Sequence, residues 1–364
     1  MDIAFHCPRT GADWSPNGGG DGGGAEQALK LVSTSLAQRG VVVSVYSGDF
    51  QRADCSHGVT WQPISSWGGR AHGIIIMWRY PTLFRICPHP RCKGLFLDLH
   101  ETIRPDILSP DVVARIQRVL FKSRFHRDLY PWVPDEKAVI IPNGVDESLY
   151  LRTMPRNPFL MINTAYPGRS LSALVHAYEV IKSQVPQASL SWAYGWSTYD
   201  RFFGGSLSMA KKKSDLQARM KILGIAELGH VEETALATLY LSAGLYVYPS
   251  EAVEVDCISV SKAQIAGAIP IGSEFGVFDE KRRFGGVYVA AKRRRNQIWD
   301  PEWGDDDSIT DPEQMRAWID KVCEELVNPR SELERSVMRR VAAAEFNIAS
   351  VVDRWCDLIC SFSS

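Results

Sequence analysis

Carboxylates follow an apolar, strand-like segment in the stretch YPSEAVEVDCISVSKAQIAGAIP, Tyr248 to Pro270, and precede a predicted helix. The loop holds Glu254 and Asp256, and we expect the helix from Ile258 to Ala266 with Gly267 at its C-terminal end. The first turn of a helix offers free backbone N–H groups and the positive end of the helix dipole, which suit a phosphate. The pattern therefore predicts an anion site beside carboxylates, or else an ordinary βαβ crossover whose acidic residues only face solvent.

Two further polar residues follow apolar segments that are typical of buried parallel strands. Arg79 comes after Gly73 to Met77, and His100 comes after Leu95 to Leu99. Side chains at the carboxyl ends of parallel strands point into the crevice where α/β proteins bind ligands, so we expect both residues to serve a site. For His100 the alternative is a helix cap or a hydrogen-bonded core histidine.

A glycine-rich loop, Gly11 to Gly24, separates the first expected strand from the first expected helix. Glycines let the backbone approach a ligand closely, because no Cβ intervenes and positive φ angles are allowed. The pattern G-x-G-x-x-A at Gly20, Gly22 and Ala25, with Asp49 further on, would indicate a dinucleotide site. That fingerprint needs its turn directly at the end of the strand, whereas these glycines begin about a dozen residues later. A flexible surface loop is the third interpretation.

Several of these segments together resemble the family 4 glycosyltransferases, which have the two-domain GT-B fold. The residues that resemble the C-terminal signature of that family are Ser250, Glu254, Lys262, Ala263, Gln264, Ala266, Gly267 and Pro270. In the family an acidic residue opens the loop, and a second glutamate commonly follows eight positions later. Here the first position is Glu254 and the second is Lys262.

Three other segments carry the same resemblance. Gly23 to Glu26 (GGAE) resembles the family's Gly-Gly-x-Glu loop, which lies over the donor phosphates. Val139 to Asp146 (VIIPNGVD), with Asn143 in its turn, resembles the passage into the second domain. Arg169 falls where the family has a basic residue aimed at the donor diphosphate, and arginine suits this because its planar fork binds two phosphate oxygens at once.

The resemblance implies roles for individual residues. His100 and Glu254 would be catalytic residues beside the transferred sugar, and Glu254 would hold hydroxyls of the donor sugar. The implied donor-binding residues are Gly23, Gly24, Arg169, Gly195, Val231, Asp256, Cys257, Ile258 and Lys262. The implied acceptor or cleft residues are Glu26, Arg79 and Asn143. No metal is expected, because the arginine, the helix start and the glycine loop could stabilise the leaving diphosphate.

The chain departs from the family pattern at three positions. Lys262 has donors only, so it cannot accept the hydrogen bond that the family's second glutamate accepts from the nucleotide ribose. Ser170 replaces the glycine that follows the basic residue, and Thr164 stands where the family has another cation. Lys262 could turn to the diphosphate and offset the missing cation, or the site could have lost activity.

Composition excludes several classes of protein. The chain has 41 Lys and Arg against 42 Asp and Glu, which argues against a general nucleic-acid binder. The basic runs Lys211 to Lys213 and Lys292 to Arg295 leave peripheral contact with anionic lipid open. Neither a signal peptide nor a run of about 18 apolar residues is visible, so a cytoplasmic location is expected.

The eight cysteines are scattered, which fits buried thiols rather than a disulfide framework. Cys87, His89 and Cys92 lie close together, but a second Cys/His pair at zinc-finger spacing is missing from the sequence, so no metal site is expected there.

The predicted strands and helices alternate along the chain, which is typical of α/β proteins. The expected strands are Ile3 to His6, Val41 to Tyr46, Gly73 to Met77, Leu95 to Leu99, Phe159 to Asn163, Ala188 to Tyr194 and Gly244 to Tyr248. The expected helices are Ala25 to Gln38, Leu171 to Gln184, Glu233 to Ala243, Ile258 to Ala266, Pro312 to Leu326, Ser331 to Ala344 and a C-terminal one. The polar, lysine-rich segment Tyr199 to Ala218 is expected to be an insertion or a mobile loop.

With the resemblance, this pattern predicts a GT-B architecture: two Rossmann-like domains with parallel sheets that face each other across a cleft, and a C-terminal helix that crosses back to the first domain. The expected domains are residues 1–152 on the acceptor side, residues 153–345 on the donor side and the helix 346–364.

The predicted function is transfer of a sugar, a hexose or a pentose, from a nucleotide-diphosphate donor to a hydroxyl of a glycan or another glycoconjugate acceptor. The resemblance implies retention of the anomeric configuration without a metal or other cofactor. Two alternatives remain: a catalytically silent sugar-nucleotide or glycan-binding protein of the same fold, and an NAD(P)-dependent oxidoreductase. The sequence leaves the sugar, the base, the acceptor, the linkage and the oligomeric state open.

Overall fold

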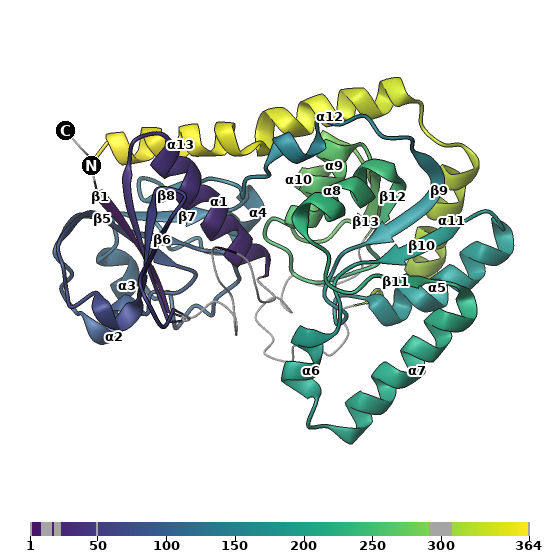
Figure 1. The fold of residues 1–364 in the computed structure, drawn as a ribbon, viewed down its shortest axis with the longest axis horizontal. Coiled ribbons are helices and arrows are strands. Elements are labelled where there is room, and N and C mark those ends of the chain that lie inside the picture. Colours follow the sequence, from purple (N-terminus) through teal and green to yellow (C-terminus); the bar gives the residue numbers. More distant parts are fainter. Residues whose placement is uncertain (1, 9–16, 18–22, 49, 291–307, 363–364) are drawn as a thin grey trace. The chain divides into compact units, whose positions relative to one another are not determined.

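The computed structural model describes residues 2–8, 17, 23–48, 50–290 and 308–362 (Figure 1). The chain divides into two compact units: unit 1 comprises residues 1–146 and 345–364, and unit 2 comprises residues 147–344. The basic run Lys292 to Arg295 and three residues of the dinucleotide pattern, Gly20, Gly22 and Asp49, lie outside the described residues.

Unit 1 is built on an eight-stranded sheet in the order β3-β4-β2-β1-β5-β6-β7-β8, parallel throughout except that β3 is antiparallel to β4. Its central strands are apolar runs that are buried on both faces, such as Ile74 to Met77 in β5. The strands are β1 (Asp2–Cys7), β2 (Val42–Ser47), β3 (Asp54–Ser56), β4 (Val59–Pro63), β5 (His72–Trp78), β6 (Cys92–Asp98), β7 (Arg118–Phe121) and β8 (Ala138–Ile140).

The strand order of unit 1 reverses at β1, which pairs with β2 on one side and β5 on the other. The carboxyl ends of β1 and β5 therefore form a topological switch point, where open α/β sheets bind ligands. Arg79 directly follows β5, and His100 lies two residues beyond the end of the neighbouring strand β6.

The helices of unit 1 are α1 (Gly24–Gln38), α2 (Leu83–Ile86), α3 (Pro110–Ala114), α4 (Arg124–Asp128), α13 (Ile348–Cys360) and the 3₁₀ turn η1 (Ile64–Ser66). The C-terminal helix α13 belongs to this unit, since the ring of Trp355 packs edge-to-face on Phe5 with centroids 6.1 Å apart. The turn before it is tied to the end of the first segment, because Val145 exchanges backbone hydrogen bonds with Phe346 and Ile348. Gly144 permits this approach, since a Cβ there would lie 2.5 Å from Ile348 Cδ1.

Unit 2 is built on a six-stranded parallel sheet in the order β11-β10-β9-β12-β13-β14. The order reverses between β9 and β12, so their carboxyl ends form the switch point of this unit. The side chain of Asn163, the last residue of β9, donates to the Val247 carbonyl at 2.8 Å and ties the two ends together. The strands are β9 (Asn157–Asn163), β10 (Ser189–Trp192), β11 (Ala226–Glu227), β12 (Ala243–Val247), β13 (Ile269–Ser273) and β14 (Val287–Val289).

The helices of unit 2 surround a core in which Trp318 is fully buried and donates to the Ile271 carbonyl at 3.2 Å. They are α5 (Leu171–Gln184), α6 (Ser197–Phe203), α7 (Leu207–Leu223), α8 (Glu233–Ser242), α9 (Ile258–Ala266), α10 (Phe278–Lys281), α11 (Pro312–Val327) and α12 (Glu332–Phe346), with 3₁₀ turns η2 (Glu147–Tyr150) and η3 (Arg282–Phe284).

The expectation of a loop over Tyr199 to Ala218 is wrong, because these residues lie mostly in α6 and α7 (Figure 1). Lys213 on α7 lies 2.7 Å from a carboxylate oxygen of Asp200 on α6 and ties the two helices together. Phe203 and Leu216 pack on the core of unit 2, so a few apolar contacts suffice to dock a largely polar pair of helices.

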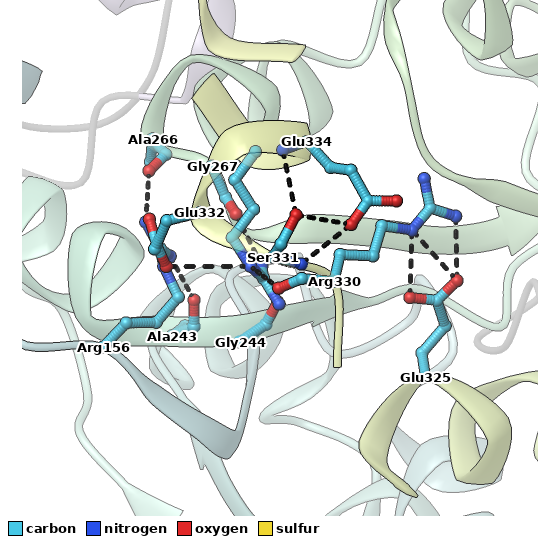
Figure 2. A network of polar contacts seen from close by, with 11 residues as sticks. Arg156, Ala243, Gly244, Ala266, Gly267, Glu325, Arg330, Ser331, Glu332 and Glu334 are labelled. Carbon is cyan, nitrogen blue, oxygen red and sulfur yellow. Dashed lines mark hydrogen bonds and ion pairs between the residues drawn. The ribbon is translucent and has the colours of Figure 1, made fainter. Parts of the chain in front are cut away.

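Two arginines bind the C-terminal end of α9 from behind. Arg156 donates to the Ala266 carbonyl at 2.9 Å (Figure 2). Arg335 on α12 is fully buried and donates to the carbonyls of Gly244 and Gly267 at 2.8 and 2.7 Å. Cations at this end satisfy carbonyls that the helix leaves unpaired and complement its dipole. The two arginines hold the C-terminal end of α9 in place, and the N-terminal end of the same helix is the predicted phosphate-binding site.

Candidate functional site

The loops at the switch point of unit 2 carry Arg169, after β9, and Glu254, after β12. Arg169 Nε lies 3.9 Å from Glu254 Oε1, and each side chain is 23% exposed. The Tyr248 hydroxyl donates to the same carboxylate oxygen at 2.9 Å. The structure thus brings together the predicted donor cation and the predicted catalytic carboxylate. Tyr248 positions Glu254, and sequence reasoning missed this role because it treated Tyr248 only as the last residue of an apolar strand.

Helix α9 begins directly after this loop, with Cys257 as its N-cap at φ 56°. A residue with a Cβ pays roughly 1–2 kcal/mol to adopt this left-handed conformation, so the surrounding loop must hold it there. No described side chain caps the first turn, which starts at Ile258. The Val260 N–H donates to the Cys257 carbonyl at 3.0 Å, so the helix leaves the N–H groups of Ile258 and Ser259 to a ligand or solvent. Burial raises the pKa of the Cys257 thiol well above its ordinary value, so no thiolate charge opposes an anion here.

Asp256, predicted to bind the donor, is buried in an ion pair. Lys281 Nζ lies 2.9 Å from Asp256 Oδ1, and the two side chains are 2% and 4% exposed. The same ammonium donates to the Ser261 hydroxyl at 2.6 Å. This arrangement balances the charge of Asp256 and holds α10 to the first turns of α9.

Lys262, in the second turn of α9, is also paired. Its Nζ lies 2.9 Å from both carboxylate oxygens of Glu233, in the first turn of α8. The Lys262 side chain is 10% exposed and that of Glu233 is 38% exposed. A diphosphate would therefore compete with Glu233 for Lys262. Sequence reasoning missed this pairing, because the two residues come from different helices.

The other two departures from the family pattern lie at the carboxyl end of β9. The Thr164 hydroxyl is 2.6 Å from the Tyr240 hydroxyl and buried. Ser170, the N-cap of α5, has φ 96°, and its buried Oγ has no hydrogen-bond partner among the described residues. Glycine adopts this φ without a steric penalty, which is the physical reason for a glycine at such a position.

Gly195 follows β10 with φ 88°, and a Cβ there would lie 3.1 Å from the backbone nitrogen of His230. The structure therefore places Gly195 against the segment that leads to Val231, and both are predicted donor-binding residues. Both lie at the carboxyl end of the sheet of unit 2, one strand away from Arg169.

In unit 1, Arg79 lies between two carboxylates. Its Nη1 is 3.1 Å from Glu26 Oε1 in the first turn of α1, and its Nη2 bonds to Glu101, which also accepts from the Tyr80 hydroxyl. Arg79 has φ 71°, a strained conformation that these partners help to hold. A Cβ on Gly23 would lie 2.8 Å from Glu26 Oε2, so the glycine of the predicted loop adjoins this group.

Of the remaining predicted residues, Gly24 is the first residue of α1. Asn143 directly precedes Gly144, the glycine that approaches Ile348.

Behind Arg79 lies a buried group of ionisable residues. Lys122 Nζ is 2.5 Å from Asp98 Oδ1, and His100 Nε2 is 3.0 Å from Asp98 Oδ2. Burial alone would raise the pKa of Asp98, but Lys122 and His100 outweigh it and lower that pKa. Burial, with the charge of Lys122 beside it, lowers the pKa of His100 to about 4. Asp98 and Lys122 were missed from sequence, although a lysine at the end of an apolar strand was a visible signal.

Within the residues that the structure describes, no three His, Cys, Asp or Glu side chains are grouped so that they could hold a metal ion. None of the helices in the described ranges is long and apolar enough to span a membrane. Sixteen residues, 8–23, separate β1 from α1. A dinucleotide-binding fingerprint needs its glycine turn directly at the end of the strand, so this separation argues against that pattern.

No known family model matches the sequence, and no curated protein matches it. Solved structures do match. Sucrose-phosphate synthase from Thermosynechococcus elongatus is 13% identical with a TM-score of 0.70, covering 100% of this chain and 99% of its own. A glycosyltransferase from Rickettsia africae ESF-5 is 12% identical with a TM-score of 0.70, covering 100% and 98%.

A third similar structure is Alr3699/HepE from Anabaena in complex with UDP-glucose. It is 14% identical with a TM-score of 0.65, covering 99% of this chain and 100% of its own. At this identity the similarities establish the fold. The predicted fold class, an α/β protein of GT-B architecture with two parallel sheets, is confirmed.

Proposed function

We propose that this protein is a glycosyltransferase of the family 4 type, which transfers a sugar from a nucleotide-diphosphate donor to a hydroxyl acceptor with retention and without a metal. The observation that carries the proposal is the meeting of Arg169, Glu254 and the start of α9 at the switch point of unit 2. Two structural neighbours, AviGT4 and the protein from Rickettsia africae, are named glycosyltransferases, and another neighbour, HepE, was solved with UDP-glucose, which supports a nucleotide-sugar donor.

The reaction breaks the bond between the anomeric carbon and the diphosphate, and the electron pair leaves with the diphosphate oxygen. Arg169 and the free N–H groups of α9 supply positive charge for that developing anion. Glu254, held by Tyr248, accepts hydrogen bonds from donor-sugar hydroxyls. The acceptor oxygen forms the new bond to the anomeric carbon.

Retention is supported by the low basicity of His100, the histidine that the family resemblance assigns to the transferred sugar. An inverting transfer needs a group that takes the acceptor proton on the face opposite to the leaving group. Asp98 and His100 are paired as such a base would be, but the pKa of His100 is lowered to about 4 by burial and Lys122. The departing diphosphate oxygen, which gains a charge, is then the better acceptor of that proton, and it lies on the face where it leaves.

The test is a thermal-shift panel of UDP-, GDP-, ADP- and TDP-sugars. A ligand present at 100 times its Kd stabilises the native state by about 2.7 kcal/mol, which raises the melting temperature. We expect one donor to shift the wild type and Arg169→Ala to bind it roughly 10–100-fold more weakly, since a charge-assisted hydrogen bond is lost. The control is Arg201→Ala, an exposed arginine on α6. No shift with any donor would refute the proposal.

A silent sugar-nucleotide-binding protein is the second candidate, favoured by the ion pair that occupies Lys262. Release of the nucleoside diphosphate from the bound donor separates the two. A transferase hydrolyses its donor slowly without acceptor, and Glu254→Gln should lower that rate about 10²-fold while donor binding changes less. Binding without any release would establish the silent protein.

A further inference from the structure

The carboxyl ends of β6 and β7 hold a buried ion pair with a histidine on it. Asp98 is the last residue of β6, Lys122 directly follows β7, and His100 lies two residues beyond Asp98. All three side chains are at most 3% exposed. Buried charges are retained only when they are paired and hydrogen-bonded, and both oxygens of Asp98 are engaged here.

The carboxylate fixes the tautomer of His100. A carboxylate only accepts, so the nitrogen that faces it, Nε2, carries the proton. Nδ1 then keeps its lone pair and can only accept. The ring of Trp78 lies on the imidazole with centroids 4.0 Å apart and an interplanar angle of 33°, which fixes the plane of the ring.

Lys122 fixes the charge of the same histidine. A carboxylate beside an imidazole favours the imidazolium and would make His100 a base near neutral pH. Here the Lys122 ammonium shares that carboxylate at 2.5 Å, so a protonated His100 would place a second cation on one buried anion. Arg79 adds a further positive charge on this side.

We propose that Asp98 and Lys122 are positioning residues that hold His100 as the neutral Nε2–H tautomer, so that Nδ1 accepts a hydrogen bond from a substrate hydroxyl without taking its proton. The statement about the substrate rests on the proposed glycosyl transfer. The group that meets Nδ1 must carry a hydrogen, which a sugar hydroxyl does and an ionised phosphate or carboxylate does not. His100 therefore accepts a hydroxyl and excludes an ionised phosphate or carboxylate at Nδ1.

Other charged groups surround His100. Arg79 follows β5 and is itself paired with Glu26 of α1 and with Glu101. His126 of α4 accepts the Lys122 backbone N–H at Nδ1, and its pKa is lowered to about 3 by burial and by Lys122. His126 is thus a second neutral imidazole, and the charge of Lys122 lowers the pKa of both histidines.

The first experiment is performed on the intact wild-type protein. Long-range ¹H–¹⁵N NMR of protein labelled with ¹⁵N-histidine distinguishes the two tautomers and the imidazolium, and the His100 signals are those that His100→Gln removes. We expect the Nε2–H tautomer from pH 8 to about pH 5. A Nδ1–H tautomer, or protonation between pH 6 and 7, would overturn the proposal.

The second experiment removes the cation. Burial and Lys122 both lower the pKa of His100 to about 4, and Lys122→Met should raise it from that value, because Asp98 then faces the imidazole without a competing cation. Lys122→Arg should leave it low, and Lys93→Met, at an exposed residue of β6, is the matched control. An unchanged pKa in folded Lys122→Met would contradict the role of Lys122. If that variant does not fold, Asp98→Asn with Lys122→Met removes both buried charges, and loss of the defined tautomer is then expected.

These measurements need no nucleotide sugar, so they can fail or succeed independently of the proposed function. If the protein proves to be a transferase, Lys122→Met should also acquire a pH dependence of kcat near the new pKa of His100, which a merely structural role would not produce.

Discussion

Ser170 shows the cost of a single residue in the wrong conformation. Its φ of 96° lies in the region that favours glycine, and its buried hydroxyl is unpaired among the described residues. Ser170→Gly removes both penalties, so we expect the free energy of unfolding to rise by about 1–2 kcal/mol. Urea denaturation measures this directly.

The matched control is Ser206→Gly at the N-cap of α7. Ser206 has an extended φ of −100°, and its side chain accepts from the Met209 N–H. The substitution should therefore cost a few tenths of a kcal/mol instead of stabilising. Equal effects at the two positions would mean that the left-handed conformation of Ser170 is not strained.

At the scale of elements, α9 is held from both ends. Lys281 and Lys262 tie its first turns to α10 and α8, while Arg156 and Arg335 bind carbonyls at its other end (Figure 2). Because side chains of neighbouring elements hold both ends of α9, its start can be presented rigidly to a ligand.

Arg335 is the most buried part of this arrangement. Arg335→Met leaves the carbonyls of Gly244 and Gly267 without their donor, so we expect a loss of about 3 kcal/mol or more in the free energy of unfolding. Arg340→Met, at an exposed position of the same helix, should change it by less than about 0.5 kcal/mol. A similar loss in both variants would assign the effect to α12 in general.

At the scale of the whole molecule, the buried neutral histidines make stability depend on pH. Burial lowers the pKa of His6 and His100 to about 4 and that of His126 to about 3, and all three lie in unit 1. An unfolded histidine has a pKa near 6.5, so the unfolded chain binds more protons below that pH. The stabilisation is complete above pH 6.5 and is lost as the pH falls toward 4, by up to about 1.4 kcal/mol per pH unit for each histidine.

Hydrogen exchange followed by mass spectrometry at pH 7.5 and pH 5 checks this unit by unit. We expect peptides of unit 1 to lose protection at pH 5 more than those of unit 2, once intrinsic exchange rates are corrected. His6→Phe should reduce the pH dependence by about one proton, and His89→Gln, at an exposed residue, should leave it unchanged. Equal loss in both units would contradict the assignment to these histidines.

The sequence by itself determined the elements and their order. The apolar runs predicted β1, β5, β6 and β12, and α5 and α9 occupy the expected ranges Leu171–Gln184 and Ile258–Ala266. These are local properties: a strand buried on both faces must be apolar, and Gly267 ends α9 in the left-handed conformation that the sequence predicted. The polar segment that became α6 and α7 was misjudged because docking of a few side chains outweighed composition.

Only the tertiary structure decided which charges meet. The sequence predicts that Lys262 contacts the diphosphate or that the site has lost activity, but α8 places Glu233 against Lys262. The sequence predicts Asp98 only as part of a strand, but β7 brings Lys122 to it. The energy of an ion pair depends on distance and burial, and residues from different elements acquire both only when the sheet order sets which strands are neighbours. The tautomer and the charge of His100 therefore depend on the strands that the fold places beside it, and the residues next to His100 in the sequence do not predict them.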